Sequence, residues 1–164
     1  MAAAALTRNA RLHSHQAVRH VQRFRTLRQR REPTPEIALT PEGAAGLIIV
    51  DAAQLVAQYE TASRDILLIL DEDCPYEEQV HLALVRDDAV ADHIVIGAPY
   101  ATGAFRELST DGDVLRFNFN GDDVWRVEVR TSGSRMPEPL PPGAKRRNGW
   151  FALHYLSLIL EQPA

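Results

Sequence analysis

Short apolar runs separated by turn residues occupy the middle of the chain. Between residues 66 and 130 these runs are about five to eight residues long, and the dipeptides Asp111-Gly112 and Asn120-Gly121 separate the last three. Asn-Gly and Asp-Gly are favoured at the centre of tight β-hairpin turns. We therefore expect a mainly antiparallel sheet of about six or seven strands, connected as hairpins or a meander.

The expected strands follow these runs. Ile66–Leu70 is wholly apolar, which is typical of a central strand. The run at 150–160 is also almost wholly apolar and must be buried. Its length permits a strand or a helix, and we favour a strand that returns to the sheet. The remaining strands are expected at 47–50, 79–86, 91–97, 104–108, 114–119 and 124–130.

Side-chain alternation constrains the last hairpin. Phe117 and Trp125 can share a buried face only if the Asn120-Gly121 loop has three or five residues. Trp125 would then lie opposite Phe117 or Phe119, and we expect both Phe117 and Trp125 to be buried.

The preceding hairpin suits a two-residue turn at Asp111-Gly112. That turn would set Leu108 opposite Leu115, and it would pair Glu107 with Arg116 on the outer face.

Charge divides the chain into a basic arm and an acidic body. Residues 1–32 hold eight arginines and one acid, a net charge of +7, whereas the remainder carries −11. Apolar residues from Ala17 to Leu27 recur at spacings of three and four, which indicates a helix in the arm. The spacing of Leu55, Val56 and Tyr59 indicates a second helix over 52–63.

These elements define the expected organisation. Residues 1–32 are a basic arm, helical or disordered; residues 33–46 are a Pro- and Gly-rich linker; residues 47–164 are a single α+β domain. The predicted fold class is therefore α+β: an antiparallel sheet with one or two helices and a helical arm.

Three roles suit the basic arm. It can dock on its own acidic domain, because tethered opposite charges have a high local concentration. It can bind nucleic acid, since arginines neutralise phosphates. It can also be a leader or a targeting segment without a role in the folded protein. Arg19, Arg23 and Arg30 are the candidate contact residues.

An acidic segment supplies the other candidate binding residues. Asp71, Asp73, Glu77 and Glu78 follow the central strand, where oxygen ligands could hold Ca²⁺ or Mg²⁺. No Asp-x-Asp-x-Asp-Gly pattern is present, so a solvated turn or a dock for the arm is favoured over a metal site. Tyr100 lies in the small-residue loop 97–103 and could border a ligand.

No motif in the chain assigns a catalytic chemistry. Phosphate-binding glycine loops and the Gly-x-Ser-x-Gly pattern are absent. Acids surround Cys74, which disfavours its thiolate. His81 and His93 would face each other only if the hairpin between them had an odd-numbered loop centred near Asp87, which would give half of a zinc site with Glu78 or Asp92 nearby. Two ordinary sheet histidines are the favoured reading, and we expect no cofactor and no bound metal.

The absence of such motifs favours a non-enzymatic interaction protein, such as an adaptor, an immunity-type protein or an assembly subunit. Its partner would be a protein or a second copy. The alternatives are a small-ligand or enzymatic β-fold with a pocket near 71–78 and 97–103, or nucleic-acid binding through the arm. One cysteine and no run of about 18 apolar residues favour a cytoplasmic protein without a membrane span.

Overall fold

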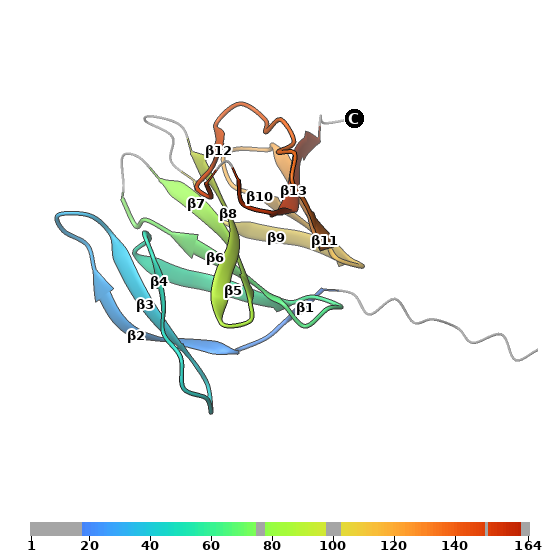
Figure 1. Ribbon diagram of the computed structural model, residues 1–164. Helices are drawn as coiled ribbons and strands as arrows, with labels where there is room; N and C mark the ends of the chain where they lie inside the picture. Colours follow the sequence, from blue (N-terminus) through green and yellow to red (C-terminus); the bar gives the residue numbers. More distant parts are fainter. Residues whose placement is uncertain (1–17, 75–77, 98–102, 150, 162–164) are drawn as a thin grey trace, which may run out of the picture.

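The described part of the chain folds into three antiparallel sheets (Figure 1). The computed structural model describes residues 18–74, 78–97, 103–149 and 151–161. Within these ranges the chain forms thirteen strands and no helix. The expected α+β class is therefore wrong, because the described part of the protein is all-β.

The central sheet has six strands. Their spatial order is β1 (Arg19–His20), β5 (Gln54–Glu60), β6 (Ile66–Asp71), β7 (Gln79–Arg86), β8 (Ala89–Gly97) and β12 (Ala144–Arg146). Strands β5 to β8 form a meander, because each pairs with the next along the chain.

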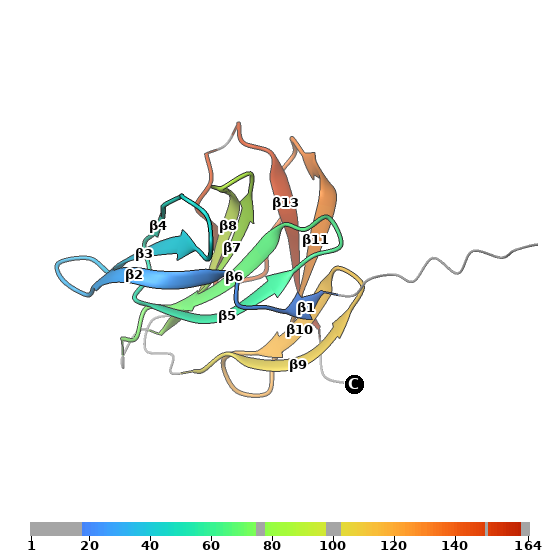
Figure 2. The same ribbon diagram turned by 90° about the horizontal axis from the view of Figure 1, so that it is seen from below.

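Two smaller sheets lie on either side of the central one (Figure 2). The four-stranded sheet has the order β13 (His154–Glu161), β11 (Val124–Ser134), β10 (Val114–Asn118) and β9 (Arg106–Asp111). The three-stranded sheet has the order β2 (Phe24–Arg30), β3 (Glu36–Pro41) and β4 (Ile48–Val50).

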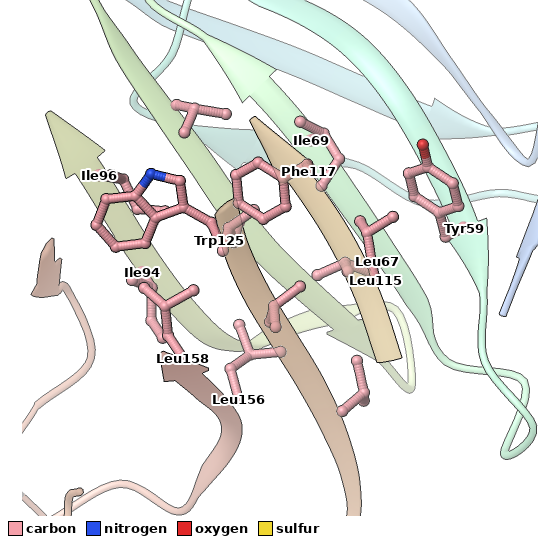
Figure 3. Packing of buried hydrophobic residues seen from close by; sticks show 14 of the residues in the cluster. Tyr59, Leu67, Ile69, Ile94, Ile96, Leu115, Phe117, Trp125, Leu156 and Leu158 are labelled. Atoms are coloured by element: carbon pink, nitrogen blue, oxygen red, sulfur yellow. The ribbon is translucent and has the colours of Figure 1, made fainter. Parts of the chain in front are cut away.

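The larger core lies between the central and four-stranded sheets (Figure 3). Phe117 and Trp125 occupy it from the four-stranded sheet, and both are buried as expected. Alternate residues of the central sheet meet them, including Leu67 and Ile69 of β6. This alternation follows from the two-residue period of a strand.

A second core fills the opposite side of the central sheet. Leu68 and Leu70 of β6 pack there with Ile37 and Leu39 of β3. Strand β6 therefore buries both of its faces, which explains why its sequence is apolar without alternation. Strand β3 lies inside the segment that we expected to be a linker.

Both predicted helices are bulged strands. The arm forms β1 and β2 over its described residues, and 54–60 forms β5. The pairing of β2 with β3 skips Leu27, and the pairing of β5 with β6 skips Val56. Each bulge adds one residue, so the two-residue alternation changes phase and imitates the spacing of a helix.

The strand predictions between 66 and 130 are otherwise confirmed, with ends shifted by a few residues. Trp125 lies opposite Phe117 across a five-residue loop, as the alternation required. The register that we predicted for the preceding hairpin was wrong, because Asp111 pairs with Val114 and the turn is Gly112-Asp113. The run at 150–160 contains strand β13, as favoured.

Candidate ligand-binding site

Three polar side chains form a diagonal row across the central sheet, on the face towards the three-stranded sheet. The register pairs His93 with Ala83, so His93 and His81 are diagonal neighbours on β8 and β7. Glu72 follows β6 by one residue and lies two residues beyond Leu70, the direct partner of His81. Antiparallel pairing thus brings together groups from three segments.

Hydrogen bonds join these three side chains. Nδ1 of His81 lies 3.0 Å from Nε2 of His93, and Nε2 of His81 lies 3.1 Å from Oε1 of Glu72. His81 is fully buried and His93 nearly so. Burial, followed by the charges of His81 and Arg147, lowers the pKa of His93 to about 4, although Asp92 opposes the shift. His93 is therefore neutral at neutral pH.

A hollow of about 460 Å³ lies beside His93. Its walls come from the edge strand β4, the first half of β8, and residues 147–149 and 152. This volume lies within the range of small ligand sites in proteins. The lining residues are Ile49, Val50, Asp51, Val90, Ala91, His93, Arg147, Asn148, Gly149 and Ala152.

One lining residue of this hollow, Ile49, is apolar and exposed, and so are two residues near the lining in the sequence. Ile49 is 49% exposed, its neighbour Leu47 is 54% exposed, and Phe151 beside Ala152 is 98% exposed. Arg147 adds a positive charge, and no carboxylate of the described residues forms a salt bridge with it. The site therefore combines apolar surface, the cation of Arg147, the carboxylate of Asp51 and one neutral imidazole.

A buried ion pair next to His93 in the sequence stabilises the wall of the hollow that β8 forms. The Asp92 carboxylate is fully buried and binds the guanidinium of Arg146. It also accepts hydrogen bonds from the backbone N–H groups of His93, Tyr155 and Leu156, at 2.8, 2.7 and 2.8 Å. These bonds tie β8 to β12 and β13, so Asp92 has a structural role.

The predicted acidic segment does not form one site in the described residues. An Asp71 oxygen accepts the N–H of Asp73, and burial raises the pKa of the Asp71 carboxyl. Asp73 pairs with Arg31, whereas Glu78 accepts the N–H of Gly103. Glu77 lies outside the described residues.

The remaining predicted residues are also dispersed. Tyr100 lies outside the described residues. Arg19 pairs with Glu60, and Arg30 shares Glu36 with Arg28. Arg23 contributes its backbone N–H to a hydrogen bond with Gln58.

These contacts show where the described part of the arm lies. Strand β1 pairs with β5, and Arg31 reaches the acidic segment at Asp73. They are the contacts expected of an arm that docks on its own domain. The predicted helical arm is replaced by strands, because β1 pairs with β5 and β2 pairs with β3.

Two of the three residues of the polar row, His81 and His93, were singled out from the sequence. They were expected to face each other only if an odd loop centred near Asp87 joined their strands, whereas the turn is the two-residue Asp87-Asp88 and the two rings are diagonal neighbours. The prediction missed Glu72 and considered Glu78 or Asp92 instead. The signal for Glu72 was its parity with Leu70, which continues the same face of β6 beyond the strand end.

Within the described ranges, no three side chains among His, Cys, Asp and Glu lie close enough to hold a metal ion. No helix long and apolar enough to cross a membrane occurs in that same part of the chain.

Comparison with known proteins gives a weak and partial likeness. The 4-hydroxy-3-methylbut-2-enyl diphosphate reductases of Yersinia pestis and Yersinia pseudotuberculosis are 22% identical to this chain over 99 residues. The match covers 58% of this chain and 31% of those enzymes, so it does not show membership of their family. No family model and no solved structure matches the chain.

Proposed function

We propose that the protein is a non-enzymatic binding protein that holds an extended segment of a partner protein along β4. The observation that carries this proposal is the edge position of β4 beside the hollow. Among the described strands, β4 pairs only with β3, through Ile37–Val50, Ala38–Ile49 and Leu39–Ile48. Its other edge therefore offers backbone groups to an added strand.

The alternation of β4 gives an added strand two kinds of surface. Ile48 and Val50 point into the core, whereas Leu47 and Ile49 point outwards and are exposed. A strand added beside β4 would direct alternate side chains into the hollow, towards Val90, and the others towards Ile49. Main-chain bonds would supply affinity, and the hollow would supply selectivity.

The residues around the hollow favour a polypeptide as its occupant. Exposed apolar surface rimmed by polar groups is typical of protein interaction sites. Ile49 provides that surface at the hollow, the exposed Phe151 stands beside the lining residue Ala152 in the sequence, and Arg147 can pair with an acid of the partner. The occupant should therefore be an apolar segment that carries an acidic residue.

Selection of peptides from a random linear display library tests this proposal. The native protein should enrich sequences that alternate apolar residues, and Ile49→Asp should bind the enriched peptides at least about tenfold more weakly, a cost of roughly 1.4 kcal/mol. Ile159→Asp is the matched control, because Ile159 is a similarly exposed strand residue that does not line the hollow.

Two results would refute the proposal. One is an absence of enriched sequences, and the other is equal weakening by Ile49→Asp and Ile159→Asp. If sedimentation showed that the protein dimerises and that Ile49→Asp abolishes the dimer, the occupant would be a second copy rather than a foreign partner.

A further inference from the structure

His93 presents one ring nitrogen that the protein itself does not use. Its Nε2 bonds to His81, and its Nδ1 has no hydrogen-bond partner among the described residues. His93 also lines the hollow. Whether Nδ1 donates or accepts a hydrogen bond therefore decides which groups can bind beside it.

The hydrogen bond between Glu72 and His81 determines which nitrogen of His93 carries the proton. A carboxylate accepts hydrogen bonds and donates none, so Nε2 of His81 must donate to Glu72. Where the His81 ring is neutral it has only one N–H, which leaves its Nδ1 as an acceptor. Nε2 of His93 must then donate to it, and Nδ1 of His93 is left as an acceptor.

This acceptor is poorly suited to catalysis as a base. General bases work best when their pKa lies near the operating pH. The pKa of His93 is lowered to about 4, mainly by burial. Such a group binds protons weakly, but it still accepts a hydrogen bond from a neutral donor. Recognition fits the observed environment better than proton transfer.

We infer that Nδ1 of His93 selects a bound segment that inserts a neutral hydrogen-bond donor into the hollow, a Ser or Thr hydroxyl or an Asn or Gln amide. This inference rests on the proposed function. Glu72 and His81 act as positioning residues, because they hold His93 in its accepting form. An apolar residue at the same position would cover an unpaired acceptor, which is unfavourable.

The ring nitrogens can be observed in the free protein. At pH 7.5, long-range ¹⁵N–¹H correlation spectra should show Nδ1 of His93 unprotonated and Nε2 protonated. A proton on Nδ1 would overturn the inference without any ligand being added. In Glu72→Gln the amide can donate as well as accept, so the opposite tautomer of His93 should become populated.

Binding provides the second test. An enriched peptide with a Ser at the inserted position should bind the native protein at least about tenfold better than its Ala analogue, as expected for a site built around a hydrogen bond. His93→Phe should reduce this Ser-to-Ala ratio to near one, and Glu72→Gln should reduce it partly. An unchanged ratio in His93→Phe would refute the inference.

The two proposals fail in different ways. Failure of strand addition at β4 appears as binding that is insensitive to Ile49→Asp. Failure of donor recognition appears as an unchanged Ser-to-Ala ratio while Ile49→Asp still weakens binding, or as a proton on Nδ1 in the free protein.

Discussion

Asp92 is a buried charge whose partners are all supplied by the fold. Its carboxylate binds Arg146 and three backbone N–H groups. Removing one partner of a buried pair leaves the other charge unsatisfied, which is far more costly than losing an exposed pair. The residue identity alone could not reveal this, because Asp92 lies in a sequence with several other acids.

The first prediction concerns this carboxylate. Asp92→Ala should lower the free energy of unfolding by about 3–5 kcal/mol, because Arg146 would remain buried without a counter-charge. Chemical denaturation would measure the loss. Asp122→Ala is the control, since Asp122 is exposed, and it should change stability by less than about 0.5 kcal/mol. Similar values for the two variants would contradict the structural role of Asp92.

The second prediction concerns the pH dependence of stability at His93. Its pKa falls from 6.5 to about 4 on folding, so between these values the unfolded state binds the extra proton. The contribution of His93 is therefore complete above pH 6.5 and is lost as the pH falls towards 4. The loss should reach about 3 kcal/mol at most.

Neighbouring charged groups also influence the protonation of His93, so a variant that lacks this histidine is needed to separate its contribution to the pH dependence of stability. His81 and Arg147 oppose its protonation, and Asp92 favours it. The difference in unfolding free energy between the native protein and His93→Phe should narrow as the pH falls from 6.5 to 4. A constant difference across this window would show that His93 does not titrate as described.

At the scale of the element, bulges explain the two false helices. Leu27 and Val56 are the extra residues of β2 and β5, and both are exposed despite being apolar. A single inserted residue moves the following side chains to the other face, so a strand acquires spacings of three and four. Periodicity alone could not separate this pattern from a helix, whereas the regular strands β6 and β7 were predicted well.

The third prediction concerns how β2 attaches to β5. The Gln58 side chain accepts the N–H groups of Arg23 and Phe24 at 3.0 and 2.6 Å, and it donates to the carbonyl of Phe24 at 2.7 Å. A side-chain amide thus satisfies backbone groups where β2 crosses β5. Gln58→Ala should cost about 2–4 kcal/mol, because buried backbone groups of Phe24 lose their partners.

Amide hydrogen exchange shows whether the loss of stability in Gln58→Ala occurs where β2 attaches to β5. The amide of Phe24 should exchange much faster in Gln58→Ala, while the amides of β11 and β13 should keep their relative protection. Gln54→Ala is the control on the same strand, since Gln54 is exposed. If both variants left the Phe24 amide equally protected, Gln58 would not hold β2 in place.

At the scale of the whole molecule, the sequence predicted one core and missed the other. The core around Phe117 and Trp125 followed from regular alternation between clear turns. The second core depends on Ile37 and Leu39, which lie among prolines and glycines typical of a linker. Local composition therefore concealed a strand whose burial depends on the distant strand β6.

The fourth prediction tests this three-layer arrangement with two neighbouring residues. Leu67 and Leu68 are adjacent on β6, both fully buried, and they point into different cores. In a two-layer sandwich one of two such neighbours would face solvent, and its truncation would change stability little. In three layers, each truncation removes buried methyl groups from a packed core.

Leu67→Ala and Leu68→Ala should therefore each lower the unfolding free energy by about 2–5 kcal/mol. Leu47→Ala is the control, because Leu47 is 54% exposed and should cost less than about 0.5 kcal/mol. Since β6 belongs to both cores, each variant should also unfold in a single transition by circular dichroism and by tryptophan fluorescence. A cost below about 1 kcal/mol for Leu68→Ala alone would mean that the three-stranded sheet does not cover that face, and β4 would then not border the hollow.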